Sequence, residues 1–300
     1  HDVRTAAGED ADVRLRIGDV FRDAVHETLE HVRRLHVDLA QPFDARWCGG
    51  DAFRTAFFNA LSMSFPVGEQ YFIDSLKNGA QKLAPAERQA FEEDLRGFIG
   101  QEATHRHLHA LFNRELTRQG LTNEFEKRAA RRIRANQHLD ARKHVAVTAA
   151  TEHFTALFAQ WLMQHPEALE GAEQRLAYLW LWHSAEESEH RNVAFDLYRA
   201  LGGNEYWRLR IFRYVTFTFL TDVLRQTVRN LWHDGSLFKT STWSSAWKLL
   251  FAKGGLFRES FGMWRDYFKP GFHPSNHPDR LSQQWLQQHA NAYAPVTQTV

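Results

Sequence analysis

The stretch that decides the fold reads Trp182-His183-Ser184-Ala185-Glu186-Glu187-Ser188-Glu189-His190 and lies inside a helical segment from Leu176 to Leu201. On a seam of alternating three- and four-residue steps, apolar residues occupy both ends of this segment. His183, Glu187 and His190 fall on the same seam, so they are predicted to face the core. Buried carboxylates and imidazoles are costly unless they are paired or bind a metal. The seam therefore indicates a metal-binding helix.

Three other segments place polar residues in apolar seams. Residues 91–116 contain a second Glu-x-x-His, while residues 58–76 and 145–163 each contain one lone Glu. One Glu from each of two helices and Glu-x-x-His from each of two others form the di-iron or di-manganese site of ferritin-like four-helix bundles. We therefore expect an all-α fold, a ferritin-like four-helix bundle with a dinuclear metal site. The six predicted ligands are Glu69, Glu102, His105, Glu152, Glu187 and His190.

The spacing of these residues supports the prediction more than the motif does. With 17 His in 300 residues, about one Glu-x-x-His is expected by chance. The lone Glu, however, precedes its Glu-x-x-His by 33 residues in the first half (102 − 69) and by 35 in the second (187 − 152). The alternative, that these are surface charges, would turn apolar seam residues such as Phe98 and Leu197 to solvent. Each half is predicted to form one helical hairpin.

Four polar side chains adjoin the predicted ligands. His183 lies one turn before Glu187 and is either a seventh metal ligand or a hydrogen-bond partner of a ligating carboxylate. His109, one turn after His105, could reach a metal or hydrogen-bond a bridging carboxylate. Glu186 points about 100° away from Glu187, towards a neighbouring helix. His153 is expected to be structural. If the centre hydrolyses its substrate, Glu186 and His109 are the candidate catalytic acids or bases.

The motifs around these residues resemble a bacterial family of predicted metal-dependent hydrolases. The likeness spans roughly Phe43 to Pro278 and is carried by residues 57–62, 65–69, 98–105, 152–155, 182–196 and 271–274. The segment from His183 to His190 also resembles the helix of di-iron arylamine N-oxygenases of the p-aminobenzoate type. In those enzymes an additional His one turn before the Glu supplies a third imidazole. This second resemblance implies that His183 is a metal ligand.

Composition narrows the class of protein. A chain of 300 residues with 43% hydrophobic and 24% charged residues is typical of a globular protein. Its formal net charge of +1, with signs interspersed, argues against a nucleic-acid partner. The single cysteine, Cys48, excludes an internal disulfide, and residues 1–12 have no apolar run of a signal peptide, so we expect a cytoplasmic protein. The apolar window 211–224 is too short and too charged to span a membrane.

Three regions are expected along the chain. Residues 1–42 form an N-terminal extension with an amphipathic helix, residues 43–203 the metal-binding bundle, and residues 204–300 aromatic-rich helices packed on it. No strand is predicted. Single helices are expected from Pro85 to Gly120 and through 176–201, whereas Pro66 should kink or restart the first ligand helix. The C-terminal aromatic residues are expected to be core, with a hydrophobic substrate channel or contact with a membrane surface as alternatives.

The ligand set predicts a redox enzyme. Four carboxylates neutralise two Fe(II), and the few imidazoles leave positions where dioxygen can bind. We expect a di-iron (or Mn/Fe, or dimanganese) oxygenase that oxidises a small, apolar organic substrate and takes electrons from an unidentified donor. The alternative is a dinuclear hydrolase using Zn or Mn. A ferritin-like metal store is disfavoured by the aromatic C-terminal region, and a homodimer is a further expectation.

Overall fold

The structure is a computed structural model that describes residues 32–277 and 280–296, and the described chain is mostly helical. The all-α prediction is confirmed. The α-helices are α2 (Ala52–Ser62), α3 (Phe65–Ala80), α4 (Pro85–Ala90), α5 (Glu92–Arg118), α6 (Glu124–Asn136), α7 (Ala141–Gln164), α8 (Gln174–His190), α9 (Val193–Ala200), α10 (Glu205–His233), α11 (Thr240–Leu250), α12 (Leu256–Asp266) and α13 (Arg280–Gln288). Short 3-10 turns η1 (Pro166–Leu169), η2 (Pro274–Asn276) and η3 (Ala290–Ala292) connect some of them.

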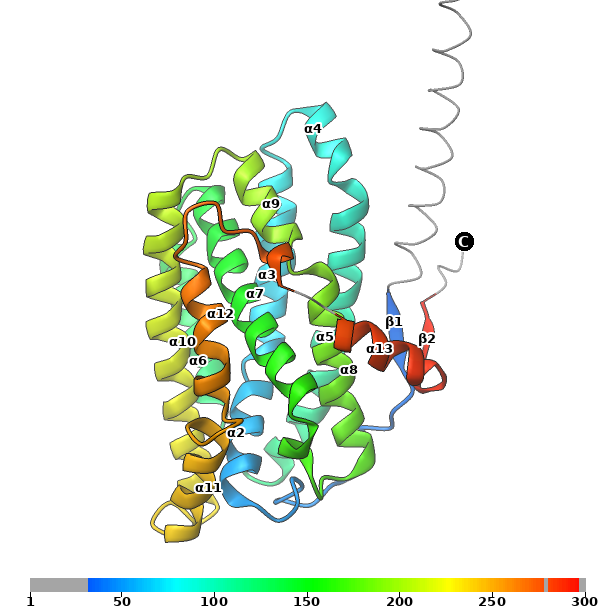
Figure 1. Ribbon diagram of the computed structural model, residues 1–300, viewed down its shortest axis with the longest axis vertical. Helices are drawn as coiled ribbons and strands as arrows, with labels where there is room; N and C mark the ends of the chain where they lie inside the picture. Colours follow the sequence, from blue (N-terminus) through cyan, green and yellow to red (C-terminus); the bar gives the residue numbers. More distant parts are fainter. Residues whose placement is uncertain (1–31, 278–279, 297–300) are drawn as a thin grey trace, which may run out of the picture.

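Four of these helices form a closed bundle (Figure 1). Helix α3 packs against α5 and α7, and α8 packs against the same two helices. The two predicted hairpins thus correspond to α3 with α5 and α7 with α8. Each helix turns its apolar seam inward: Phe72 and Leu76 of α3, and Phe98 and Phe112 of α5, are buried. The polar seam residues are carried inward with these apolar neighbours.

The first ligand helix restarts one turn before Glu69, as Pro66 predicted. Helix α2 ends at Ser62 and α3 begins at Phe65, so Pro66 occupies the first turn of α3. At that position the missing proline N–H has no helical partner to lose. The Ser64 hydroxyl donates back to the carbonyl of Leu61 at 2.7 Å, which closes the turn between the two helices.

Two of the predicted helices are interrupted, which corrects the sequence analysis. The helix expected from Pro85 breaks at Phe91, whose N–H bonds to the carbonyl of Arg88 in a tight turn. Helix α4 has no buried residue, so packing does not hold it in line with α5. The helix expected through 176–201 is divided between α8 and α9, where the buried Arg191 donates to the carbonyl of His277. No Gly or Pro marks either break.

The prediction that no strand forms is wrong for one small sheet. Strand β1 (Arg33–Leu35) pairs antiparallel with β2 (Tyr293–Pro295), and Leu35 lies opposite Tyr293. Three-residue strands are too short to reveal an alternating pattern, and their partners stand at opposite ends of the sequence. The predicted N-terminal helix falls largely on residues 1–31, outside the described residues. Residues 32–42 contain β1 and irregular chain instead.

The C-terminal helices cover the outside of the bundle. Helix α10 packs on α2 and α7, α11 on α2, α12 on α7 and α13 on α8. Helix α10 runs along one edge of the molecule, with its other side facing outward (Figure 1). Among the described residues no helix combines the length and apolar character needed to cross a membrane.

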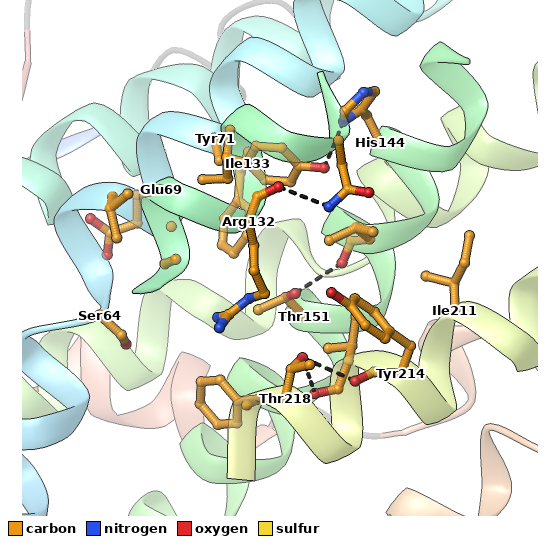
Figure 2. A pocket seen from close by; sticks show the side chains of 18 of the residues that line it. Ser64, Glu69, Tyr71, Arg132, Ile133, His144, Thr151, Ile211, Tyr214 and Thr218 are labelled. Atoms are coloured by element: carbon orange, nitrogen blue, oxygen red, sulfur yellow. Dashed lines mark hydrogen bonds between the residues drawn. The ribbon is translucent and has the colours of Figure 1, made fainter. Parts of the chain in front are cut away.

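A cavity of 490 Å³ lies between α3, α6, α7 and α10 (Figure 2). Its walls include Phe65, Phe72, Val147, Ile211 and Val215, which makes them mainly apolar. Two carboxylates that face the bundle interior, those of Glu69 and Glu187, also line it. The cavity therefore connects the interior of the bundle with its outer layer.

Candidate metal centre

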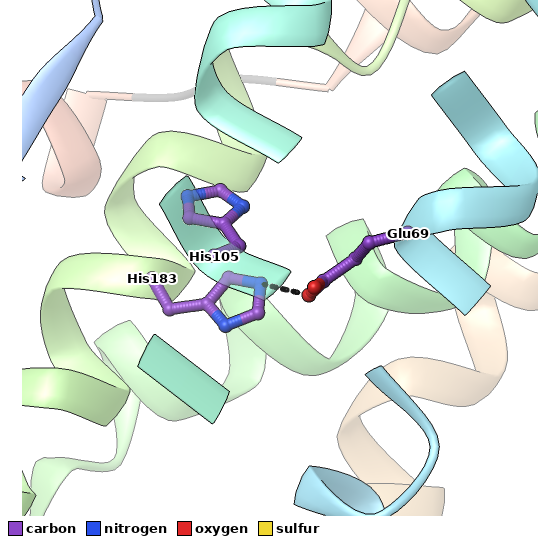
Figure 3. A group of neighbouring side chains, drawn as sticks. All are labelled: Glu69, His105 and His183. Carbon is purple, nitrogen blue, oxygen red and sulfur yellow. Dashed lines mark ion pairs between the residues drawn. The ribbon is translucent and has the colours of Figure 1, made fainter. Parts of the chain in front are cut away.

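The structure brings the six predicted ligands and the seventh candidate, His183, together in the middle of the bundle. They form a three-residue cluster of Glu69, His105 and His183 (Figure 3) and a four-residue cluster of Glu102, Glu152, Glu187 and His190. Within each cluster the candidate ligand atoms all lie within 4.8 Å of one another. None of the seven residues is more than 4% exposed. The rings of His105 and His190 are 6.0 Å apart between centroids, so the two clusters are neighbours.

Glu187 stands between the two clusters. Its Oε1 atom lies 2.7 Å from Nε2 of His183 and 3.5 Å from Nδ1 of His105, on the side of the three-residue cluster. Its Oε2 atom lies 3.7 Å from Nε2 of His190, on the side of the four-residue cluster. His190 Nε2 is also 2.9 Å from Oε1 of Glu102. One carboxylate thus presents one oxygen to each cluster, the arrangement of a bridging ligand.

Most of the candidate ligand atoms are buried without a hydrogen-bond partner among the described residues. This holds for both carboxylate oxygens of Glu69, Glu102 and Glu152 and for single atoms of His105, Glu187 and His190. An unsatisfied buried polar group costs about 1–3 kcal/mol, and more if it is charged. Carboxylate oxygens and imidazole nitrogens in this number fit iron, manganese or zinc. Four carboxylates and two divalent cations also cancel in charge, so the residues fit a dinuclear metal site.

The pKa values of the clustered side chains also favour a metal site. Burial, followed by repulsion from neighbouring carboxylates, raises the pKa of Glu69 and Glu152 well above the usual range. Burial alone would raise the pKa of Glu187 too, but the nearby imidazoles of His105, His183 and His190 hold it well below its usual range. Burial alone would lower the pKa of His105, whereas Glu186 and Glu187 raise it to about 10. Without a cation, Glu69 and Glu152 therefore favour the protonated form, and a bound metal must displace those protons.

Each metal-facing imidazole is oriented through its other nitrogen. Nε2 of His105 lies 2.9 Å from Oε2 of Glu186, and Nδ1 of His190 lies 2.7 Å from Oε1 of Gln101. Nδ1 of His183 lies 2.8 Å from Nε2 of His109. When the far nitrogen donates a proton in such a bond, the near nitrogen keeps its lone pair for a metal. The three rings are therefore held in the tautomers that metal binding needs.

Comparison with known proteins agrees with this centre. A family model of predicted metal-dependent hydrolases matches residues 31–278, which is more than half of the chain. The chain belongs to this family. All seven ligand candidates of this family member lie inside the matched range, and the family resemblance predicted from the motifs is confirmed. No curated protein and no solved structure gives a match to the chain. The likeness of the His183 helix to N-oxygenases stays a prediction.

In this family member a buried arginine supports both clusters. Nη1 of Arg33, in strand β1, donates to Oε1 of Glu186 at 3.1 Å, and Glu186 in turn bonds His105. The same guanidinium makes two bonds to Glu189, at 2.7 and 3.0 Å. The amide of Gln101 donates to Glu189 at 2.8 Å and accepts from His190. Sequence patterns missed Arg33, because it lies 153 positions from Glu186 in a strand with no recognisable motif.

The two candidate acid–base residues hold ligands in place. Glu186 is fully buried between His105 and Arg33. His109 bonds His183 and, through Nδ1, the hydroxyl of Ser62 at 2.9 Å. Ser62 then donates to Oδ1 of Asn113 at 2.8 Å. Neither Glu186 nor His109 belongs to the residues that line the cavity.

His153 lies outside the centre, although it follows Glu152 directly. Its Nε2 is 3.1 Å from the carbonyl of Met263, and its ring packs against Phe212, Tyr267 and Phe272. Burial lowers the pKa of His153 to about 3 and keeps the ring neutral. The structure therefore gives His153 a role in attaching α12 to α7.

Proposed function

We propose that this protein is a dinuclear metal oxidase that activates dioxygen and oxidises a small organic substrate with an apolar body. The observation that carries the proposal is the position of Glu187, with one carboxylate oxygen facing each of two buried ligand clusters. Three carboxylates and three imidazoles complete the set. Such carboxylate-rich sets suit pairs of iron ions, because carboxylates can shift between terminal and bridging positions.

Bound iron would supply the redox chemistry, and the protein residues would supply position and exclusion of water. Arg33, Glu186, Gln101 and His109 fix the imidazoles through their far nitrogens. Burial of all seven ligands keeps the reacting region dry. Repeated turnover requires an electron donor, which we expect to be a separate protein or reductant.

The cavity supports a small-molecule substrate. Its volume of 490 Å³ falls within the roughly 300–1,000 Å³ of small-molecule sites. Glu69 and Glu187 line it, whereas the other five candidate ligands do not. A substrate in the cavity therefore meets one carboxylate of each cluster, against walls with few polar groups.

The second candidate is a dinuclear metal-dependent hydrolase, which the description of the family favours. In that reaction the metals would lower the pKa of bound water and generate hydroxide near neutral pH. A hydrolase also needs an acid to protonate the leaving group at the open side of the centre. Glu186 and His109, the candidates for that role, are engaged with the far nitrogens of His105 and His183. This engagement makes us prefer oxidation.

The deciding experiment compares metals under two atmospheres. The full chain is loaded anaerobically with Fe(II), its metal content is measured, and uptake of dioxygen is followed after mixing with aerated buffer. Parallel samples with Zn(II) or Mn(II) are assayed anaerobically against ester, amide and phosphoester substrates. We expect two irons per chain and dioxygen uptake in proportion to them. Two bound irons without dioxygen uptake, together with anaerobic hydrolysis, would establish the hydrolase instead. Uptake of many irons would indicate storage.

A further inference from the structure

The wall of the cavity carries three positively charged side chains, of which Arg132 alone forms a salt bridge with a described acidic residue. Besides the metal-facing Glu69 and Glu187, the residues that line the cavity include three cations, Arg132, Lys143 and Arg210, and no acid. We propose that the cavity binds a carboxylate with an extended apolar body, its charged end at Lys143 and Arg210 and its apolar end towards Glu69 and Glu187. This inference rests on the proposed function, because it names the substrate class of the same site.

Lys143 and Arg210 share one aromatic ring. Nζ of Lys143 lies 4.8 Å from the centre of the Trp207 ring, and Cζ of Arg210 lies 5.6 Å from it. Arg210 also donates to the hydroxyl of Tyr206 at 3.0 Å. Neither cation forms a salt bridge with a described acidic residue; Asp140, near Lys143, accepts from Arg142 at 2.9 Å. Two cations beside one indole, without acidic partners among the described residues, favour binding of an anion at this part of the wall.

The third cation of the wall is already paired. Arg132 and Arg128 both form salt bridges with the buried Asp222. Two guanidinium groups share this single carboxylate, so it is not available to Lys143 or Arg210. Figure 2 shows Arg132 between Glu69 and Thr151. The anion is therefore expected at Lys143 and Arg210 and not at Arg132.

The distance from Lys143 to the metal centre indicates how long the proposed substrate should be. Lys143 and Glu152 are nine residues apart on α7, which corresponds to about 13 Å along the helix axis. An extended chain of carbon atoms, with bonds of about 1.5 Å at angles near 111°, spans that distance with about ten carbons. Val147, Ile211 and Val215 line the intervening cavity. The polar pair Tyr71–His144 is satisfied internally, with its hydroxyl and Nδ1 2.8 Å apart.

Calorimetric titration tests the proposal without requiring turnover. Decanoate and its uncharged methyl ester are titrated into the full chain loaded with Zn(II), for the native protein and for the double variant Lys143→Gln/Arg210→Gln. Loss of charge-assisted contacts should weaken decanoate binding about tenfold to a hundredfold and leave the ester unchanged. The control Arg213→Gln removes an exposed cation of α10 that stacks on Phe268 and lies outside the cavity lining. It should change neither affinity.

Other results of the titration would overturn the proposal or show a structural effect of the substitutions. Unchanged decanoate affinity in the double variant would overturn the proposal, because the carboxylate would then be held elsewhere, including at the metals. Equal weakening of acid and ester would show a structural effect, and absence of binding by the native protein would also overturn it. If the double variant is unstable, Lys143→Gln is compared with Lys143→Arg, which keeps the charge. Dioxygen uptake by the iron form is measured separately, so failure of the proposed function is distinguished from failure of the binding site.

A different observation concerns the outer surface of α10, α11 and α12. Among the described residues, 13 of the 15 exposed large hydrophobic side chains lie between Tyr206 and Phe261. We call these 13 side chains the aromatic face. Its most exposed members are Tyr206, Phe217, Trp232, Phe238 and Trp247, each more than 60% exposed. Exposed apolar side chains concentrated in this way mark an interaction surface.

The net charge of the segment that carries the aromatic face indicates an anionic partner. Residues 205–266 contain 10 Lys and Arg against 5 Asp and Glu, a net charge of +5, although the whole chain has a net charge of +1. Trp and Phe interspersed with Lys and Arg on amphipathic helices are typical of proteins that lie on anionic membranes. We infer that the aromatic face docks on an anionic membrane surface, with its helices parallel to the surface.

Co-sedimentation with vesicles tests this second proposal. The full chain is mixed with vesicles of phosphatidylcholine alone or of equal parts phosphatidylcholine and phosphatidylglycerol. We expect binding to the mixed vesicles that falls at least tenfold in Trp247→Ser/Phe251→Ser and weakens with salt. Leu281→Ser, an exposed apolar residue outside the aromatic face, is the matched control. Absence of binding to mixed vesicles would overturn the proposal, as would a dimer in solution that the double substitution separates into monomers.

Discussion

The two ligand clusters differ in charge. The three-residue cluster has one carboxylate, Glu69, and two imidazoles, whereas the four-residue cluster has three carboxylates and one imidazole. Each cluster contributes one carboxylate to the cavity wall, Glu69 from the first and Glu187 from the second. More anionic ligands should hold a divalent cation more tightly. We therefore expect the four-residue cluster to hold its metal more tightly than the three-residue cluster does.

The largest effect is expected at the residue that the clusters share. Glu187→Gln removes the charge that faces both clusters, so metal content should fall from two per chain to less than one. Glu186→Gln is the matched control, since an amide oxygen can still accept from His105. It should keep two metals. Metal analysis after gel filtration measures both, and the opposite result would reverse the roles of the two glutamates.

Substitution in a single cluster should separate the two metals. Glu152→Gln affects only the four-residue cluster, and Glu69→Gln only the three-residue cluster. Each variant should retain about one metal per chain, because the other cluster keeps its ligands. Titration with Fe(II) or Mn(II), followed by dialysis, gives the number and affinity of the remaining sites. Loss of both metals in both variants would contradict the idea of two unequal clusters.

A smaller effect is expected from His183. His183→Ala removes one of three ligands near the cavity and leaves the four-residue cluster intact. The variant should fold, keep the tighter metal and lose occupancy or change the spectrum at the weaker site. Circular dichroism checks the fold, and visible or electron paramagnetic resonance spectra check the metal. If metal content and spectrum stay unchanged, His183 is a supporting residue and the N-oxygenase likeness is weakened.

The smallest effects should come from residues that only orient ligands. Arg33→Met removes the support of both His105 and His190, while His109→Leu removes the support of His183 alone. Loss of such partners typically lowers metal affinity about tenfold to a hundredfold. Arg33→Met should weaken both metal sites and His109→Leu one of them, as measured by competition with a chelator. If Arg33→Met and His109→Leu weakened both metal sites equally, Arg33 and His109 would not support different ligands.

The ligands could be predicted from the sequence because they occur at helical spacing among apolar residues. Glu102, His105, Glu187 and His190 occupy seams whose remaining members are apolar, and a helix transfers that periodicity directly into space. The supporting residues follow no such rule. Arg33 reaches the centre from a three-residue strand that pairs with the far end of the chain, and Ser62 supports His183 through two hydrogen bonds. The helix break after His190 arises from tertiary contacts and has no local signal.

The most direct measurement is X-ray diffraction from crystals of the metal-loaded protein, with anomalous data on both sides of the iron or manganese absorption edge. We predict two anomalous peaks about 3–4 Å apart, as in two-metal sites. One peak should lie among Glu69, His105 and His183 and the other among Glu102, Glu152 and His190, with Glu187 between them. A single peak, or a second metal that binds away from these residues, would contradict the dinuclear centre.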